Sequence, residues 1–262
     1  MAIDLSRLRR VTATKPPRVL VYGPPGLGKT TLGAEFPSPV FVQVEDGTPG
    51  TLELTSFGHL TTFSEVMEAI SSLLAEPHDF QTFVVDSVDK LEPLVWEQTC
   101  IDNKWANIEA PGYGKGYIAA DAIWREFLTL CNDLRHQRNM NVIHIAHSSV
   151  DRFDDPQTMS YSRYDIRLHK RALALFQDEM DAILFLNQDV TVKTQESGFN
   201  KKDHKGVGGG TRWIYAEGRP SFVAKNRYGM PDKLIYKPGE GYAALAPYLP
   251  AIALPEIQQA AE

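Results

Sequence analysis

A glycine-rich octapeptide directly after a short apolar run is the feature that most constrains this chain. Residues 23–30, GPPGLGKT, fit the pattern G-x-x-x-x-G-K-[ST], and the apolar run RVLVY precedes them at 18–22. This order predicts a buried strand, a loop, and a helix over residues 29–36 that Pro37 stops. Glycines let such a loop turn its N–H groups inward, and the helix adds its positive end. The chain is therefore expected to contain a strand–loop–helix unit that cradles phosphate.

The loop predicts a site for ATP and Mg²⁺. The expected nucleotide-binding residues are Gly23, Pro24, Pro25, Gly26, Leu27, Gly28, Lys29, Thr30 and Thr31. Lys29 places a cation beside the β- and γ-phosphates, and the Thr30 hydroxyl is a ligand for Mg²⁺. Asp86 ends the apolar run TFVVD and suits the second metal ligand, whereas Asp89 is expected to be a solvated neighbour.

Composition limits the class of protein. Hydrophobic residues make up 43% of the 262 residues and charged residues 23%, which is ordinary for a globular protein with a core. The two cysteines, Cys100 and Cys131, show no CxxC spacing, which excludes a zinc finger and a disulfide framework and suits a reducing cytosol. No apolar run reaches about 18 residues and no leader-like segment is present, so we expect a cytoplasmic protein that does not contact a membrane.

The order of apolar segments predicts the architecture. Strands are expected at 18–22, 40–45, 82–86, 142–146, 181–187, 189–194, 211–217 and 221–227, and further helices at 64–76 and around 123–134. Polar or glycine-rich loops are expected at 102–117, 148–171 and 201–211. This pattern predicts an α/β fold with a mostly parallel central sheet, flanking helices and antiparallel C-terminal strands. We expect an arm at 1–17, one domain at 18–250 and a tail at 251–262.

Charge is unevenly spread along the chain. The formal net charge is −6, from 27 basic and 33 acidic residues. Residues 193–227 alone carry a net charge of +5, which leaves −11 for the remainder. A basic region on an acidic body predicts a local track for a polyanion rather than a surface that binds nucleic acid everywhere.

The position of a glutamate separates classes of nucleotide hydrolase, because hydrolysis needs a group that orients or deprotonates the attacking water. In the AAA+ class a glutamate commonly follows the metal-binding aspartate, but here Ser87 follows Asp86, which weakens that interpretation. The glycine-rich loop at residues 23–30 is called the P-loop below. The other arrangement places the glutamate at the end of the strand that comes after the helix following this loop. Glu45 occupies that position, and Asp46 is its main rival.

The order of these segments resembles the core of RecA-type recombinases over roughly residues 18–230. The resemblance is carried by the P-loop, Glu45, Asp86-Ser87, and the segments APGYGKGY (110–117), VIHIAH (142–147) and AKNR (224–227). More narrowly, the chain resembles the shortened RecA-like ATPases of bacteriophages, which are associated with single-strand DNA annealing and recombination. The resemblance implies a RecA-like P-loop fold and a Mg²⁺-dependent ATPase that single-stranded DNA stimulates.

The resemblance also implies roles for single residues. Glu45 would activate the water, Lys29 would bind phosphate, and His147 would stand where RecA has glutamine and sense the γ-phosphate. Lys225 and Arg227 would reach the γ-phosphate of a neighbouring subunit in trans. The expected partners are thus single-stranded DNA, further copies of the chain in a ring or filament, and a single-strand DNA-binding protein.

Two loops are expected to bind DNA, because each interleaves aromatic and basic residues that allow bases to stack while phosphates are neutralised. The first, near 105–117, offers Tyr113 and Lys115; the second, near 150–171, offers Arg152, Tyr161 and Arg163.

Two alternatives remain open at this point. One is a small-molecule kinase, with Glu45 and Asp46 holding the acceptor and residues 150–171 as a lid. The other is a nucleotide-gated assembly protein without significant turnover.

Overall fold

The computed structural model describes residues 15–47, 52–196 and 202–250, together with residues 4, 8 and 50. Strands in this part are β1 (Arg18–Gly23), β2 (Pro39–Gln43), β3 (Ser56–His59), β4 (Thr82–Asp86), β5 (Asn141–Phe153), β6 (Tyr161–Ile166), β7 (Ala182–Glu196), β8 (Lys202–Tyr215), β9 (Lys225–Asn226) and β10 (Lys233–Tyr236). Helices are α1 (Lys29–Ala34), α2 (Phe63–Ala75), α3 (Val88–Asn103), α4 (Lys115–Gln137), α5 (Lys170–Glu179) and α6 (Gly241–Leu245).

The strands form a sheet in the order β10-β8-β7-β1-β5-β4-β2-β3, with β6 paired to β5 and β9 paired to β7. The pairs from β7 through β1, β5, β4 and β2 to β3 are parallel. In contrast, β8, β9 and β10 pair antiparallel with their neighbours. The expected α/β fold, with a mostly parallel central sheet and antiparallel C-terminal strands, is therefore confirmed.

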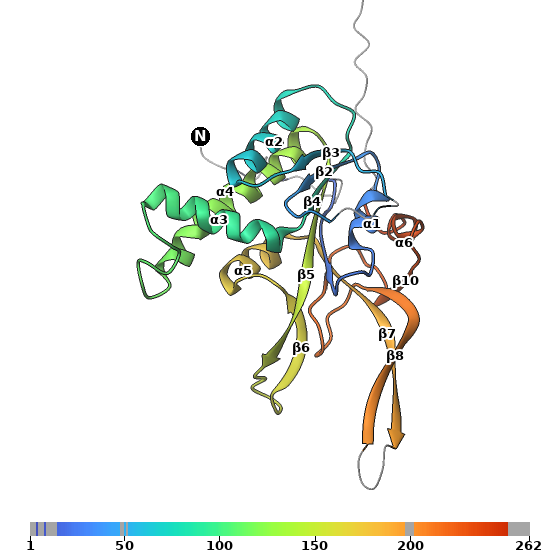
Figure 1. Cartoon of the computed structure of the whole chain (residues 1–262). Coiled ribbons are helices and arrows are strands. Elements are labelled where there is room, and N and C mark those ends of the chain that lie inside the picture. The colour runs from blue at the N-terminus through green and yellow to red at the C-terminus, as the bar shows by residue number, and fades with distance from the viewer. Residues whose placement is uncertain are drawn as a thin grey trace, which may run out of the picture.

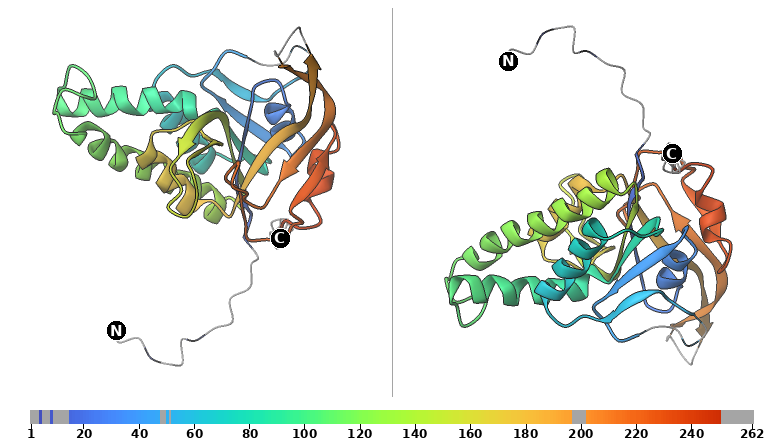
Figure 2. Two further views of the ribbon diagram at one scale, coloured as in Figure 1. Left: turned by 90° about the horizontal axis from the view of Figure 1, so that it is seen from below. Right: turned by 90° about the horizontal axis from the view of Figure 1, so that it is seen from above.

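Helices cover both faces of the sheet (Figures 1 and 2). Helices α2 to α5 lie on one face, and α1 and α6 lie on the other. Alternate side chains of β1 pack in two different hydrophobic cores, because successive side chains of a strand point to opposite faces of the sheet. Leu20 and Tyr22 join the core beneath α2–α5, whereas Val19 and Val21 join the core that includes Leu32 of α1. Burial on both faces explains why the core strands read as continuous apolar runs.

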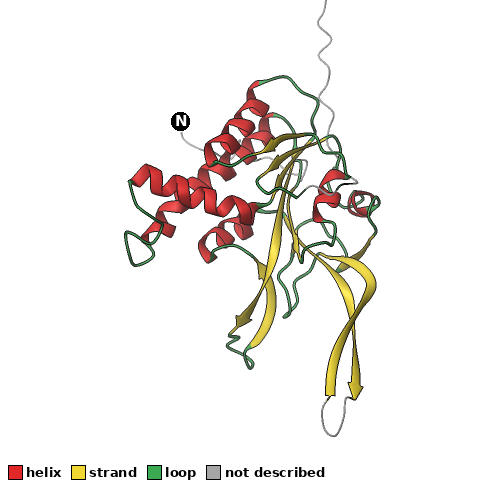
Figure 3. Ribbon diagram, viewed as in Figure 1, coloured by secondary structure: helices red, strands yellow, loops and turns green. Residues whose placement is uncertain are grey.

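Two hairpins project beyond the sheet on either side of the P-loop (Figures 1 and 3). Strand β1 lies between β5 and β7, and both of these run past its carboxyl end. Residues 148–153 of β5 pair with 161–166 of β6 and form the β5–β6 arm. Residues 187–196 of β7 pair with 202–213 of β8 and form the β7–β8 arm. The loop after β1 therefore leaves the sheet between two arms.

Both arms correct expectations drawn from the sequence. The expected polar loop at 148–171 is wrong, because this segment holds the end of β5, all of β6 and the start of α5. The expected glycine-rich loop at 201–211 is also wrong, because β8 begins at Lys202 and its backbone pairs with β7. Residues 148–163 and 201–211 are rich in polar residues or glycine, so the apolar alternation that usually signals a strand is weak in them.

The glycine at position 210 in the β7–β8 arm is explained by a close contact between the two strands. The register of β7 and β8 shifts between Gln188 and Val190, and a Cβ on Gly210 would lie 2.4 Å from the Asp189 carbonyl oxygen. Close approach of two backbones at such an irregularity requires glycine.

Several expected segments differ in length or fall outside the described residues. The strand expected at 221–227 is reduced to the two residues of β9. The side chains of the basic residues between 193 and 205, which belong to the expected polyanion track, lie outside the described residues, as does the expected tail. In the described part of the chain no helix combines the length and apolar character needed to cross a membrane.

Candidate nucleotide-binding site

The P-loop connects the end of β1 to the start of α1, as the motif predicts. Gly28 has a φ of 98°, and a Cβ at this position would lie 2.9 Å from the Tyr236 hydroxyl oxygen. The same Tyr236 hydroxyl donates a hydrogen bond of 2.8 Å to the Gly28 carbonyl. Glycine is required here both by the backbone conformation and by the tyrosine packed against it. Strand β10 therefore supports the loop from the side of the antiparallel extension.

Lys29 lies inside the loop, and only 6% of the residue is exposed. Its Nζ donates hydrogen bonds of 3.0 Å to the carbonyls of Gly23 and Pro24. Burial lowers the pKa of Lys29, while the negative charges of Asp86, Asp89 and Glu45 oppose this shift. The ammonium group thus lies inside the loop, where the motif predicts a contact with phosphate.

Thr30 and Asp86, the two residues expected to bind Mg²⁺, contact each other. The Thr30 hydroxyl donates a hydrogen bond of 2.6 Å to Asp86 Oδ2, and Asp86 ends strand β4. Burial raises the pKa of Asp86, although the hydrogen bond from Thr30 opposes this shift. Hydroxyl and carboxylate oxygens are the ligands that Mg²⁺ prefers, with the remaining positions taken by phosphate oxygens and water. The described residues contain no cluster of three histidine, cysteine or acidic side chains that would hold a metal without nucleotide.

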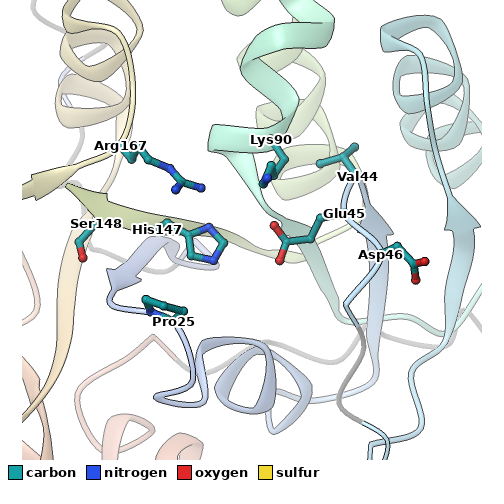
Figure 4. Close-up of a pocket in the computed structure, with 8 residues that line it drawn as sticks. All are labelled: Pro25, Val44, Glu45, Asp46, Lys90, His147, Ser148 and Arg167. Atoms are coloured by element: carbon teal, nitrogen blue, oxygen red, sulfur yellow. The ribbon is translucent and has the colours of Figure 1, made fainter.

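Glu45 lies in the turn after β2 and faces the same cavity. The expected strand to residue 45 is too long by two residues, because β2 ends at Gln43. Ser87, which follows Asp86 across a cis peptide bond, donates a hydrogen bond of 3.3 Å from its hydroxyl to Glu45 Oε2. Figure 4 shows the Glu45 carboxylate between Lys90 and His147, whereas the Asp46 carboxylate points away. Between the two candidate bases, the geometry favours Glu45.

His147 binds the buried carboxylate of Asp89, which was expected from the sequence to be exposed to solvent. Asp89 accepts hydrogen bonds from the His147 backbone N–H at 2.9 Å and from its Nδ1 at 3.2 Å. It also accepts from Arg167, through Nε at 3.0 Å and through Nη2. The Asp89 side chain is only 1% exposed, so the expectation of a solvated neighbour is wrong.

The contacts among Asp89, His147 and Arg167 fix the charge of Asp89 and favour one tautomer of His147. Burial alone would raise the pKa of Asp89, but the hydrogen bonds from His147 and Arg167 outweigh burial and hold it below its usual range. A carboxylate beside Nδ1 favours the tautomer with the proton on Nδ1, which leaves Nε2 of a neutral ring as an acceptor.

Two adjoining cavities open at this edge of the sheet. The cavity of the P-loop has a volume of about 410 Å³, and its lining includes Lys29, Thr30, Asp86 and Arg212. The neighbouring cavity of about 550 Å³ is lined by Pro25, Val44, Glu45, Asp46, Lys90, His147, Ser148 and Arg167 (Figure 4). Glu45, His147 and Pro25 line both cavities, so these residues separate the phosphate cradle from an adjacent open space.

Three residues at this site were not predicted from the sequence. Arg167 and Arg212 line the cavities, and Tyr236 holds Gly28. Arg212 lies 185 positions after Leu27, whose carbonyl it contacts, and neither arginine belongs to a motif. Only the basic character of residues 193–227 gave an indirect signal for Arg212.

The two cations expected to act in trans lie at the opposite edge of the sheet. Strand β9 pairs with Ala182 and Ile183 at the amino end of β7, far along the strands from the P-loop. Lys225 Nζ donates to the carbonyls of Gln177 at 2.6 Å and Asp178 at 3.3 Å. Arg227 pairs with Asp181 at 3.2 Å and keeps 53% of its side chain exposed. Neither cation is brought to the phosphate site of its own chain, so the role in trans stays a prediction.

The residues expected to bind DNA lie on two separate projections (Figure 1). Tyr113 is fully exposed in the loop before α4, and Lys115 is the first residue of α4 rather than a loop residue. Arg152, Tyr161 and Arg163 lie on the β5–β6 arm. The two arginines are already paired within the arm.

Their contacts are local. Arg152 contacts Asp154 at 3.2 Å, and its side chain is 76% exposed. Arg163 contacts Asp165 at 2.7 Å, and its guanidinium lies 4.0 Å from the centre of the Phe153 ring. A stacked guanidinium on an aromatic face is a surface on which a base can also stack, so binding of DNA by these residues stays a prediction.

The chain is similar to known proteins in sequence and in fold. Among solved structures, the RadB recombinase matches with 20% sequence identity and a TM-score of 0.45, over 85% of this chain and 86% of that one. No curated protein matches the chain. The sequence matches the AAA_24 family, described as an AAA domain, over residues 15–228. Because this match includes the P-loop, Glu45, Asp86 and His147 and spans most of the sequence, the chain belongs to this AAA-domain family.

Proposed function

We propose that this chain binds ATP and hydrolyses it with Mg²⁺, as a RecA-like ATPase. The observation that carries the proposal is the convergence of Lys29, Thr30, Asp86, Glu45 and His147 on one cavity at the carboxyl edge of the sheet. These residues come from the P-loop, β4, β5 and the turn after β2. Each supplies a function that phosphoryl transfer to water requires.

The chemistry follows from the contacts. Lys29 now binds the neutral carbonyls of Gly23 and Pro24, and phosphate oxygens are stronger acceptors for an ammonium group. Thr30 and Asp86 would hold Mg²⁺, which supplies charge neutralisation at the β- and γ-phosphates. Glu45, oriented by the Ser87 hydroxyl, orients or deprotonates the attacking water.

His147 connects this reaction to the β5–β6 arm. It is the last β5 residue paired with β1, and the arm begins at the next residue. Asp89 fixes the imidazole and also binds Arg167, which follows β6 directly. A change at the γ-phosphate is thereby passed to both strands of the arm.

The proposed ATPase acts on single-stranded DNA in annealing or recombination of the phage type. Its other partners are further copies of the chain and a single-strand DNA-binding protein. Support comes from the exposed Tyr113 and Arg152 and from the arms on either side of the P-loop. Lys225 and Arg227 act on the nucleotide of a neighbouring copy, because their own phosphate site lies at the other edge of the sheet.

Phosphate release measured with and without Mg²⁺, and with and without single-stranded DNA, tests the proposal. Glu45→Gln should abolish turnover and keep ATP binding, whereas Lys29→Ala should abolish both. Asp46→Asn is the matched control, because this neighbouring carboxylate points away from His147 (Figure 4). Normal turnover in Glu45→Gln, or loss of turnover only in Asp46→Asn, would contradict the assignment.

A small-molecule kinase is the second candidate, and the cavity of about 550 Å³ beside the P-loop favours it. An acceptor in this cavity would lie against Glu45 and beside the phosphate site. The product decides between the two candidates: labelled γ-phosphate is released as inorganic phosphate by an ATPase, and it is recovered on a metabolite with a kinase. Binding of ATP without either product would instead indicate a nucleotide-gated assembly protein.

A further inference from the structure

Arg212 is a basic residue that reaches the P-loop from the antiparallel extension of the sheet. It lies on β8, where its neighbours across the ladder are Gln188 of β7 and Tyr236 of β10. Its Nη1 donates a hydrogen bond of 3.2 Å to the Leu27 carbonyl in the P-loop. The side chain also lines the cavity of about 410 Å³ that contains Lys29 and Thr30.

The charge of Arg212 has no local counterion in the described part of the chain. Its side chain is half-buried, and among the described residues no carboxylate oxygen lies within 4.0 Å of its guanidinium. By contrast, Arg167, which lines the neighbouring cavity, pairs with Asp89. A cation that is partly removed from water and bound only to a neutral carbonyl is poorly compensated, and an anion in the same cavity would compensate it.

The P-loop therefore holds two cations in the same way. Lys29 Nζ donates to Gly23 and Pro24 carbonyls, and Arg212 Nη1 donates to the Leu27 carbonyl. The loop that connects these carbonyls is the one whose N–H groups cradle phosphate. A planar guanidinium offers two parallel donors, which suit a phosphate group better than a single carbonyl.

We propose that Arg212 is a phosphate-binding residue of the nucleotide site, supplied by the same chain that supplies the P-loop. The ligand class is a nucleoside di- or triphosphate, so the inference rests on the proposed function of this cavity. The contact adds a second positive charge to the cradle without a neighbouring subunit. It also ties nucleotide occupancy to the base of the β7–β8 arm, since Arg212 belongs to the strand that forms the arm.

Nucleotide affinity in a pair of matched variants tests the inference. Arg212→Gln is compared with Arg219→Gln, which removes an exposed arginine that pairs with Asp232 and does not line the cavity. Isothermal titration of ATP, ADP and adenosine is measured for the wild type and both variants. We expect Arg212→Gln to weaken ATP and ADP binding by about tenfold or more, from the loss of a charge-assisted hydrogen bond. Adenosine binding should not change, and Arg219→Gln should bind all three ligands as the wild type does.

A second measurement uses the wild-type chain and does not depend on the folding of a variant. Phenylglyoxal modifies accessible arginines, and mass spectrometry reports the extent of modification at Arg212 and Arg219 with and without ATP. We expect ATP to protect Arg212 and to leave Arg219 unchanged.

The outcomes separate the inference from the function on which it rests. Unchanged ATP affinity in Arg212→Gln, or equal modification of Arg212 with and without ATP, would overturn the inference while leaving the nucleotide site in place. A wild-type chain that does not bind ATP at all would overturn the proposed function itself.

Discussion

His144 is a fully buried histidine in the part of β5 that pairs with β1 and β4, and its titration yields a quantitative prediction. Its ring packs between Phe127 and Phe176, at 5.8 and 5.2 Å between ring centres. In the described part of the chain neither ring nitrogen has a hydrogen-bond partner. Burial, assisted by the charge of Arg18, lowers the pKa of His144 from the ordinary 6.5 to about 3.

The sign of the pH effect follows from this shift. Between pH 6.5 and about 3 the unfolded chain binds a proton at this residue and the folded chain does not. The free energy of unfolding therefore falls as the pH is lowered, by about 1.4 kcal/mol per pH unit. At pH 5 the titration of His144 alone should lower the free energy of unfolding by about 2 kcal/mol relative to neutral pH.

The substitution His144→Leu removes the titrating group and keeps an apolar side chain of similar size. Urea unfolding from pH 5 to pH 7.5 should show a smaller loss of stability in this variant than in the wild type, by about 2 kcal/mol at pH 5. His59→Leu is the matched control, because it removes an exposed histidine of β3 rather than a buried one. If the curve of His144→Leu ran parallel to that of the wild type, the buried ring would have to be protonated or paired in the folded chain, and the reasoning would fail.

Further substitutions test three other parts of the molecule. Asp89→Asn should lower turnover and destabilise the fold by about 2 kcal/mol, because Arg167 and His147 lose their buried partner; phosphate release and urea unfolding measure both, and wild-type values would refute the role. Lys225→Ala or Arg227→Ala should lower turnover and preserve ATP affinity, and mixing either with Lys29→Ala should restore some activity; no restoration on mixing would argue against action in trans. Gly210→Ala should cost about 1–3 kcal/mol in thermal or urea unfolding, because its Cβ would meet the Asp189 carbonyl at 2.4 Å; a neutral effect would show that the backbone shifts freely.

The parallel core and the strand–loop–helix unit of the P-loop were predictable because their signals are local. A loop of eight residues between an apolar run and a helix specifies the cradle wherever it occurs. The run TFVVD predicted β4 with both of its ends, because a strand buried on both faces is apolar throughout. Asp86 could be assigned beside the P-loop for the same reason, since the carboxyl ends of parallel strands share one edge of a sheet.

The contacts that complete the site were not predictable, because they join residues far apart in the sequence. Asp89 meets His147 across 58 positions, and Arg212 meets Leu27 across 185. A short polar segment after a strand gives no indication of which later residue will cover it. The expectation that Asp89 faces solvent failed for this reason.

The arms were missed for a different physical reason. Residues 148–153 and 161–166 pair with each other. Ile166 and Tyr164, near the base of this hairpin, join the core, whereas the side chains of 148–153 are half-buried or exposed. Their order depends on backbone hydrogen bonds that any residue except proline can make, and single-sequence patterns do not report these. The glycines of β8 reinforced the wrong interpretation, because glycine is depleted in most strands.

Strand β5 belongs both to the parallel sheet and to the β5–β6 arm, and it runs from beside the P-loop into the arm without a break. The six residues of β5 beyond His147 extend about 20 Å at the usual rise of a strand. A tilt of a continuous strand at the edge of the sheet would therefore be carried to the tip of the arm. A tilt of about 5° at the nucleotide edge would sweep its tip through about 2 Å, roughly half the spacing between neighbouring strands.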